Sequence, residues 1–263
     1  MFIMLSCFAP FTQVLRTLHK RPARFLSSIS EKMASVQLAD MRRPYVSGTL
    51  LEKDLPTLDP VELFGKWFLE VKESGLMYES NAVALSTTTK TGFPSSRMVL
   101  LKGYGPDGFV FFTNYNSRKG RELGENPNAS LLFYWDRIHR QVRVEGTVER
   151  TSAEVSDKYF HSRPRDSQLS AVVSQQSQVI ESRDRLEEEY AALREKHGDV
   201  FREVPRPAEW GGFCLRPVRM EFWQGHSSRL HDRILFRKVP PGEKPVPPTV
   251  AAAPGWHMER LAP

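Results

Sequence analysis

The sequence predicts a mainly β protein, a barrel with flanking helices. Five segments between residues 82 and 150 are rich in β-branched and aromatic residues, as strands are. The turns between the first three segments are short, and short turns join antiparallel strands. Few helical segments interrupt the five, and this arrangement favours a barrel.

The first element is a helix that begins after Asp59. Asp59 is a suitable N-cap, Pro60 suits the first helical position, and apolar residues recur at helical spacing as far as Val71. Gly75 is a suitable stop. The strands of the first group are then expected at residues 82–89, 95–104, 109–113, 129–135 and 140–150, with hairpin turns at 90–92 and 105–108 and a short helix over 117–123.

Polar and helical segments follow the fifth strand. Thr151 and Glu154 have the spacing of a capping box, and residues 162–180 are expected to form a loop and a short helix. Ser182 caps a charged amphipathic helix that ends at Gly198. A second group of strands is expected at residues 210–217, 219–225 and 230–238, followed by an exposed, mobile Pro- and Ala-rich insertion at 240–256.

The composition disfavours several classes of protein. The 263 residues are 40% hydrophobic and 26% charged, as in an ordinary soluble protein. No apolar run approaches the roughly 20 residues that a membrane-spanning helix needs. The two cysteines, Cys7 and Cys214, show neither paired nor metal-ligand spacing, which argues against a disulfide framework and a metal site. We therefore expect a reducing, cytoplasmic compartment.

The net charge of +6 is concentrated at the N-terminus. Residues 1–30 contain four basic residues and no acidic one, so the remainder is close to neutral. That distribution disfavours a nucleic-acid binder, whose domain itself should be basic. A mitochondrial transit peptide has the composition of this segment, but so does a tail without a targeting role, and both interpretations stay open. We expect a leader over residues 1–40 and one domain over 41–263.

Two basic pairs suit a phosphate. Arg97 and Lys102 lie in an otherwise apolar predicted strand, where a bound phosphate and an edge strand with cations reaching solvent are alternatives. Arg118 and Lys119 stand at the start of the short helix, whose free N–H groups attract anions. A solvated basic turn is the alternative for the second pair.

Two further constellations point the same way. Tyr159, Arg163 and Ser167 place a phenol, a guanidinium and a hydroxyl where they could converge on an anion, or could form an ordinary helix end. Arg229, His231 and Arg233 would share one face of a strand, near Trp223. Such a row of cations is unfavourable without an anion or an electron-rich ring opposite, so this segment favours a functional role.

These segments belong to a larger set of motifs. In chain order the motifs are RMVLLKG, FFTNYNSRKG, FYWDRIHRQVRVEG, YFHSRPRDSQ, SQQSQVI, WGGF, EFWQG, RLHDR and ERLAP. Together they resemble the pyridoxine/pyridoxamine 5′-phosphate oxidase family from about Met41 to Pro263. The resemblance implies an FMN-binding split β-barrel that works as a homodimer, with FMN at the subunit interface. It implies oxidation of pyridoxine or pyridoxamine 5′-phosphate to pyridoxal 5′-phosphate, with hydride transfer from substrate C4′ to flavin N5. Oxygen would then reoxidise the flavin and yield hydrogen peroxide, and the amine substrate would release ammonia.

The resemblance also assigns site residues by motif match. It implies FMN contacts, some of them from the partner subunit, by Arg97, Met98, Val99, Leu100, Phe112, Thr113, Arg118, Lys119, Gln141, Gln176, Ser177, Trp223 and Arg233. The substrate phosphate would be held by Lys102, Tyr159, Arg163 and Ser167. The substrate ring would meet the catalytic residues Arg229 and His231, with Leu230 between them, under a closing segment that contains Arg42 and Tyr45. Pro44 departs from the family pattern in that segment.

Three alternatives stay open. A split-barrel reductase that uses FMN or a deazaflavin would share the phosphate-binding strand and helix start, but would need neither RLHDR nor YFHSRP. A non-catalytic carrier of pyridoxal phosphate or flavin would make no peroxide with pyridoxine 5′-phosphate. A barrel that binds single-stranded nucleic acid is disfavoured by the near-neutral domain.

Overall fold

The computed structural model describes residues 41, 43–197 and 203–263. The chain divides into two units, Met1–Pro44 and Tyr45–Pro263, and every described helix and strand belongs to the second. The predicted leader and the expected helix end at Gly198 lie outside the described residues. Within the described part of the chain, no helix is long and apolar enough to cross a membrane.

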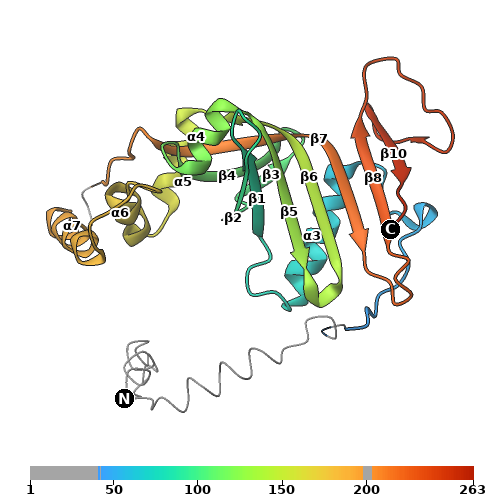
Figure 1. Ribbon diagram of the computed structural model, residues 1–263, viewed down its shortest axis with the longest axis horizontal. Helices are drawn as coiled ribbons and strands as arrows, with labels where there is room; N and C mark the ends of the chain where they lie inside the picture. Colours follow the sequence, from blue (N-terminus) through green and yellow to red (C-terminus); the bar gives the residue numbers. More distant parts are fainter. Residues whose placement is uncertain (1–40, 42, 198–202) are drawn as a thin grey trace, which may run out of the picture. The chain divides into compact units, whose positions relative to one another are not determined.

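One antiparallel sheet of ten strands, counted over the described residues, confirms the predicted barrel. Its hydrogen-bonded order is β2-β1-β5-β6-β7-β8-β10-β9, and β4 pairs with both β3 and β7 (Figure 1). The strands are β1 (Ala82–Thr88), β2 (Pro94–Leu100), β3 (Gly103–Gly105), β4 (Gly108–Asn114), β5 (Asn128–Trp135), β6 (Arg140–Arg150), β7 (Trp210–Gln224), β8 (Asp232–Lys238), β9 (Val250–Ala251) and β10 (Trp256–Arg260).

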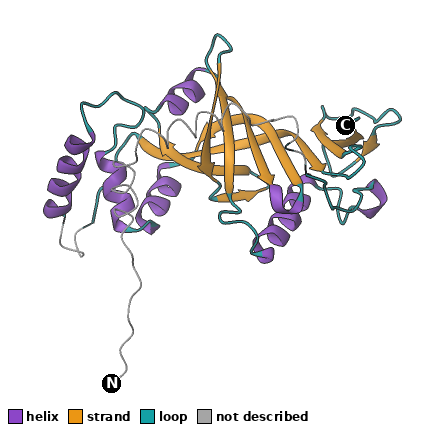
Figure 2. Ribbon diagram, turned by 60° about the horizontal axis from the view of Figure 1, so that its bottom comes forward, coloured by secondary structure: helices purple, strands orange, loops and turns teal. Residues whose placement is uncertain are grey.

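The barrel is open along one seam. Its path runs β2-β1-β5-β6-β7-β4-β3, so β2 and β3 are the two ends and share no ladder. Figure 2 shows the strands, in orange, as a curved sheet with helices, in purple, around it. The N–H of Leu101 donates to Asn81 just before β1, whereas the N–H of Lys102 donates to Val110 in β4. The chain therefore changes partner strands between Leu101 and Lys102. The single strand predicted over 95–104 was wrong for this reason, because β2 and β3 are separate strands.

β7 is one long strand where the sequence predicted two. Its first half, to Leu215, pairs with β4, and its second half, from Arg219, pairs with β8, while β6 follows both halves. The strands expected over 210–217 and 219–225 left a break at Val218. The register instead shifts between Glu145 and Gly146 of β6, because Val218 of β7 is an extra residue that bulges out of the ladder. Any side chain on Gly146 would overlap the carbonyl oxygen of Arg216. One strand thereby belongs both to the barrel and to its extension through β8 (Figure 1).

Helix α3 (Pro60–Ser74) supplies part of the core. It begins and ends as predicted, because the side chain of Asp59 accepts hydrogen bonds from the first turn and Gly75 takes a left-handed φ of 63°. Its apolar face is buried against the barrel strands, and the ring of Phe64 lies 5.0 Å from that of Phe133 in β5. Burial of this aromatic cluster contributes to the stability of the barrel.

Of the remaining described helices, one lies between β4 and β5, and three lie in succession between β6 and β7. Ser182 caps α7, as predicted. The short helix predicted over 117–123 is α4, and Ser117 is its N-cap. The capping box at Thr151 was wrong, because its N–H still donates to Gly212 in the sheet, and Ser152 is the residue that caps the next helix. These helices are α4 (Arg118–Glu125), α5 (Ala153–Ser162), α6 (Arg165–Val173) and α7 (Arg183–Lys196), and single 3-10 turns lie at η3 (Glu52–Asp54) and η4 (Asp136–Ile138).

Two differences concern the C-terminal strands. β8 begins only at Asp232, because Arg229 takes a left-handed φ of 68° and its N–H closes a turn on the carbonyl of His226. The segment predicted as an insertion is largely exposed, but it contains β9, which pairs with β10. Neither of these two short strands was predicted.

Candidate active site

A cavity of about 420 Å³ lies at the seam of the barrel. Its lining comes from β2 and β4, from α4, from the junction of α5 and α6, and from the start of β7. Pro164 and Trp210 line it together with eleven predicted site residues. These are Met98, Val99, Leu100, Lys102, Phe112, Thr113, Lys119, Tyr159, Arg163, Ser167 and Gln176. The fold thus joins segments that are far apart in the chain, and we call this cavity the seam pocket.

Arg163 is the most telling group in the seam pocket. Its Nη1 atom is buried without a hydrogen-bond partner among the described residues, and its Cζ atom lies 4.7 Å from the ring centre of Trp210. Burial lowers the pKa of Arg163. A buried donor without an acceptor is costly, so this guanidinium is poised for a ligand anion. Lys102 and Ser167 line the same pocket and add an ammonium and a hydroxyl.

Aromatic rings form one wall of the seam pocket. The ring of Tyr159 stacks on Phe112 at 4.0 Å and on Trp210 at 6.1 Å between centroids. The ammonium of Lys102 lies 5.9 Å from the Tyr159 ring centre. A flat apolar wall beside several cations suits a planar, phosphorylated ligand.

A second group of cations surrounds the start of α4. Ser117 accepts the N–H of Gly120, where any side chain would overlap the carbonyl oxygen of Tyr115. The Lys119 ammonium contacts Thr113 Oγ1 at 3.3 Å and Gln176 Oε1 at 3.0 Å. Its burial, together with the nearby charge of Arg97, lowers the pKa of Lys119 to about 8.

Glu122 is a buried carboxylate under these cations. It accepts hydrogen bonds from Thr87 Oγ1 at 2.5 Å, Ser95 Oγ at 2.6 Å, Arg118 Nε at 2.8 Å and Arg97 Nη2 at 3.3 Å. Burial alone would raise the pKa of Glu122, but the hydrogen bonds from Ser95, Thr87 and Arg118 outweigh it and, with the charge of Arg97, lower it to about 2. Arg97, predicted as an FMN contact, is thus held at the edge of the seam pocket and does not line it.

A second cluster lies at the other end of β7. The ring of Tyr45 lies 5.7 Å from Trp223, 5.4 Å from His231 and 5.0 Å from His139. The guanidinium of Arg229 is 5.8 Å from the same Tyr45 ring. Four predicted site residues therefore meet here, and we call them the ring cluster: Tyr45, Trp223, Arg229 and His231.

The His231 imidazole has a defined orientation. Its Nδ1 accepts the backbone N–H of His226 at 3.0 Å, so a neutral ring carries its proton on Nε2. Burial, followed by the charge of Arg229, lowers the pKa of His231. The ring is therefore neutral at physiological pH, with Nε2 available as a donor.

The predicted row of three cations on one strand face was wrong. The turn at Arg229 separates Arg229 and His231 from β8, so Arg233 does not continue their alignment. The Arg233 guanidinium instead makes two hydrogen bonds to Glu221, at 2.7 and 3.1 Å, and a third to the carbonyl of Ala262 at 2.9 Å. Gln141 stands opposite Trp223 in the β6–β7 register.

Two predicted site residues have unusual backbones. Ser177 and Arg229 take φ values of 70° and 68°, in the left-handed region that favours glycine. Residues with such strained backbone angles cluster at functional sites, where the surrounding structure holds them in place. Of the other predicted residues, Leu230 is 70% exposed, and Arg42 lies outside the described residues.

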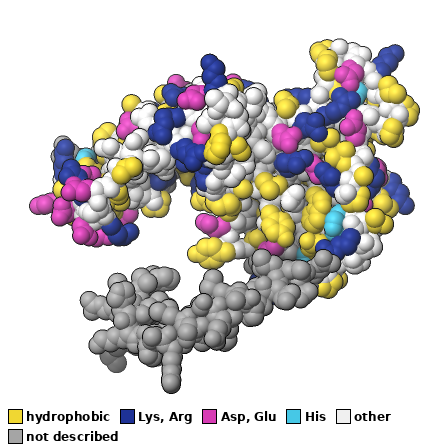
Figure 3. Space-filling model, in the orientation of Figure 1, with side chains coloured by type: hydrophobic (Ala, Val, Ile, Leu, Met, Phe, Trp, Pro, Cys, Tyr) yellow, Lys and Arg dark blue, Asp and Glu magenta, His cyan; other side chains and the backbone are white. Residues whose placement is uncertain are grey.

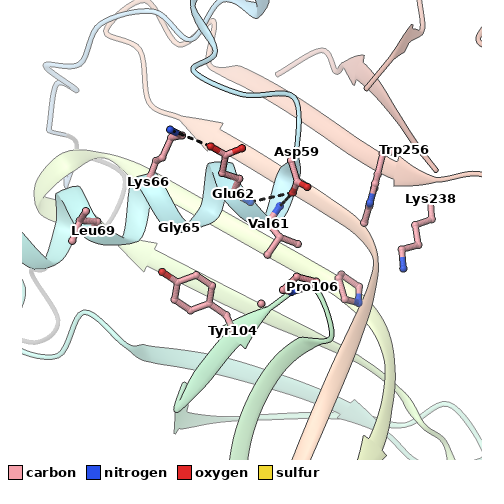
Figure 4. A pocket seen from close by; sticks show the side chains of 12 residues that line it. Asp59, Val61, Glu62, Gly65, Lys66, Leu69, Tyr104, Pro106, Lys238 and Trp256 are labelled. Carbon is pink, nitrogen blue, oxygen red and sulfur yellow. Dashed lines mark hydrogen bonds and ion pairs between the residues drawn. The ribbon is translucent and has the colours of Figure 1, made fainter. Parts of the chain in front are cut away.

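A larger cavity, of about 540 Å³, contains none of the predicted residues (Figure 4). It lies between α3, the β3–β4 turn and the C-terminal strands, with Tyr104 and Trp256 in its wall. Its charged groups are mostly satisfied, since Lys66 pairs with Glu62 at 3.2 Å and Asp59 caps α3. The cavity therefore lacks the buried unpaired donor that distinguishes the seam pocket.

Sequence reasoning missed four residues of these sites. Trp210 carried no separate signal, because only the fold brings it to Arg163. Glu122 follows Arg118 at the i,i+4 spacing of a helical ion pair, which could have indicated it. Glu221 and Gly225 stand near Trp223, and a side chain on Gly225 would come within 2.9 Å of Cγ of Tyr45.

The seam and its pocket define a class of fold, the split β-barrel, here with a pocket lined by cations and aromatic rings. Residues 71–197 match the family model described as Pyridoxamine 5′-phosphate oxidase. Residues 210–263 match the model described as Pyridoxine 5′-phosphate oxidase C-terminal dimerisation region. The chain belongs to the pyridoxine/pyridoxamine 5′-phosphate oxidase family.

Individual relatives agree. The chain is 48% identical over 250 residues to pyridoxine-5′-phosphate oxidase of Bos taurus, covering 92% of this chain and 95% of that protein. It is 50% identical over 226 residues to pyridoxine/pyridoxamine 5′-phosphate oxidase of Rubrobacter xylanophilus, covering 86% and 96%. Among solved structures, PhzG of Burkholderia lata, in complex with tetrahydrophenazine-1-carboxylic acid, superposes with a TM-score of 0.71 at 28% identity, covering 82% of this chain and 99% of that one. An FMN-binding protein of Nostoc punctiforme shares the fold, with a TM-score of 0.56 at 16% identity, covering 76% and 96%.

Proposed function

We propose that this chain is an FMN-dependent oxidase that converts pyridoxine and pyridoxamine 5′-phosphates to pyridoxal 5′-phosphate and reduces oxygen to hydrogen peroxide. The observation that carries the proposal is the buried, unpartnered Arg163 donor in the seam pocket of a chain that belongs to this family. Purified protein supplied with FMN and pyridoxine 5′-phosphate should produce peroxide and pyridoxal 5′-phosphate in equal amounts. Absence of both products would refute the assignment.

The seam pocket suits the phosphate of the substrate. Lys102, Arg163 and Ser167 offer a point charge, a forked donor and a hydroxyl, and Tyr159 offers a phenol. The free Arg163 Nη1 supplies a donor that no described residue uses. Binding through the phosphate leaves the pyridine ring free to be positioned by other groups. The residues that set substrate affinity are then different from those that orient the ring for reaction.

The residues around α4 fit the FMN phosphate. Arg97, Arg118 and Lys119 surround a single carboxylate, so the cluster has an excess of positive charge that a phosphate monoester would balance. Thr113 and Gln176 add polar groups beside Lys119. When bound, FMN supplies the redox chemistry, accepting a hydride from the substrate and passing two electrons to oxygen.

The ring cluster suits the substrate ring. The Arg229 guanidinium and the Nε2 donor of neutral His231 would orient the ring and its polar substituents for reaction. Tyr45 would cover that end of the site, packed on Trp223. These residues position the substrate and exclude water, and no strong general base is needed.

A complete site needs two copies of the chain. Trp210 in the seam pocket and Trp223 in the ring cluster stand at opposite ends of β7, separated by roughly 40 Å of extended strand at about 3.3 Å a residue. A bend in β7 shortens this distance, but one small substrate still cannot bridge both ends. The partner subunit of a homodimer would supply the ring cluster to each seam pocket. The match of residues 210–263 to a dimerisation region supports this arrangement.

Exposed apolar residues accompany both clusters. Met98 in the seam pocket is 64% exposed and Leu230 beside the ring cluster is 70% exposed. Figure 3 shows hydrophobic side chains scattered among Lys and Arg on the face it displays. Large apolar side chains in a site are better explained by a covering partner than by solvent.

Mixed dimers test the two-chain site. Neither Arg163→Ala nor Arg229→Ala protein should turn over substrate at concentrations well below the normal KM. After unfolding and refolding together, the mixture should recover about a quarter of wild-type activity, because half of the randomly paired dimers are mixed and each has one intact site. Recovery no greater than the sum of the separate variants would show that one chain supplies both clusters. Mixing each variant with itself is the control.

We also propose that residues 1–30 direct the protein to mitochondria, on the strength of their basic, acid-free composition. Fusion of the full chain to a fluorescent reporter should give mitochondrial signal that is lost when residues 1–30 are removed. A wholly cytosolic distribution of the full-length fusion would contradict the proposal.

A further inference from the structure

We propose that Glu122 is a positioning residue for the FMN phosphate, which holds the guanidinium groups of Arg97 and Arg118 in the geometry that the phosphate needs. The inference rests on the proposed function, because the ligand concerned is FMN. Glu122 itself would not touch the flavin, since two arginines stand on its oxygens.

The two carboxylate oxygens of Glu122 accept hydrogen bonds from different residues. Oε1 accepts Nε of Arg118 at 2.8 Å, and no described residue accepts from the two terminal nitrogens of that arginine. Oε2 accepts Nη2 of Arg97 together with the hydroxyls of Thr87 and Ser95. One carboxylate therefore links β1, β2 and α4, and it directs the free end of Arg118 outward.

Arg97 is held by several partners at once. Besides Glu122, its guanidinium donates to Ser95 Oγ, to Thr87 Oγ1 at 2.5 Å and to the carbonyl of Leu85 at 3.3 Å. These contacts leave the guanidinium few alternative orientations. Loss of the Glu122 charge would weaken the acceptor that Arg97 shares with Arg118. Both guanidinium groups would then lose the contact that fixes their orientation.

The charges explain why a carboxylate is needed. Arg97, Arg118 and Lys119 carry three positive charges that act on one another. Burial lowers the pKa of Lys119, and the charge of Arg97 lowers it further. Burial also lowers the pKa of Arg97, the charge of Glu122 opposes this change, and the charge of Arg118 adds to it. Glu122 cancels one of the three. The remaining excess of two charges matches a phosphate monoester, which carries about −1.5 to −2 at pH 7.

Positioning and simple electrostatics predict opposite results for Glu122→Gln. A negative charge near a phosphate site opposes phosphate binding, so its removal should tighten FMN if charge alone matters. If Glu122 positions the arginines, its removal should weaken FMN, because misplaced guanidinium groups lose charge-assisted hydrogen bonds. The sign of the change therefore decides between the two roles.

The experiment measures flavin binding to the full-length apoprotein by fluorescence quenching, with FMN and with riboflavin, which has no phosphate. Glu122→Gln should weaken FMN on the order of 10- to 100-fold, as expected for loss of one or two charge-assisted hydrogen bonds, and leave riboflavin unchanged. Glu122→Asp, which keeps the charge, should recover part of the loss. Glu125→Gln, at the exposed end of the same helix, is the matched control and should behave as wild type.

Several outcomes would overturn the inference. FMN binding to Glu122→Gln that is equal to or tighter than wild type would show that charge outweighs geometry. Equal weakening of FMN and riboflavin would show a purely structural role. Should Glu122→Gln fail to fold, Ser95→Ala, which removes one donor to Glu122, should lower the FMN-to-riboflavin preference several-fold, and an unchanged preference would refute the idea. Wild-type protein that does not bind FMN would instead refute the proposed function.

Discussion

The Lys119 ammonium should make FMN binding depend on pH above about 8. Burial and the charge of Arg97 lower the pKa of Lys119 to about 8 in the free protein, while the phosphate needs the protonated form. A bound phosphate would raise this pKa again. At pH 9 only about a tenth of the free protein carries the proton, so FMN affinity at pH 9 should be about tenfold lower than its plateau near pH 7.

The matched variant is Lys119→Arg, because a guanidinium keeps its proton throughout this range. Its FMN affinity should be nearly flat from pH 7 to 9.5, even if the absolute affinity is lower. The assay is fluorescence titration of apoprotein at constant ionic strength, with riboflavin as the ligand that lacks the phosphate. Equal pH slopes for wild type and Lys119→Arg would refute the reasoning, and so would an equal slope for riboflavin.

Two further predictions concern the ring cluster and the neighbouring Arg233. Gly225→Ala should raise KM for pyridoxine 5′-phosphate about tenfold, since its Cβ would stand 2.9 Å from Cγ of Tyr45 and overpacking displaces neighbours. Gly124→Ala, with nothing within 4 Å, is the control, and matching kinetics would contradict the prediction. Arg229→Ala should keep FMN and lose most turnover, whereas Arg233→Ala should weaken FMN binding. Flavin content and steady-state rates measured on both proteins check this, and equal losses would overturn the division of roles.

Local signals predicted the elements whose ends depend on a few neighbouring residues. Asp59 and Gly75 bound helix α3 as expected, because caps act within one turn. Ser117 and Ser182 likewise mark the starts of α4 and α7. The hairpin turn between Gly105 and Gly108 was also correct, because its geometry needs only the residues in it.

Long-range pairing decided the elements that the sequence misjudged. A strand was expected to end at Pro217, but the ladder with β6 continues through a bulge at Val218. Strand β2 ends at Leu100 because the chain pairs with a different strand, β4, from Lys102 onward. The periodicity at Arg229 was interrupted by a left-handed turn. The first two differences depend on residues distant in the chain, which local propensity does not contain, whereas the turn at Arg229 closes locally on the carbonyl of His226.

The sequence by itself determined the family, the mainly β barrel and the residue types for which two phosphate sites are proposed. Only the tertiary structure decided how those residues are grouped. It places eleven of them around one pocket at the seam. Arg97 instead pairs with Glu122 at the edge of that pocket. Tyr45, Arg229 and His231 lie together at the other end of β7. The physical reason is that a motif records which side chains are present, whereas the strand pairing sets which of them meet.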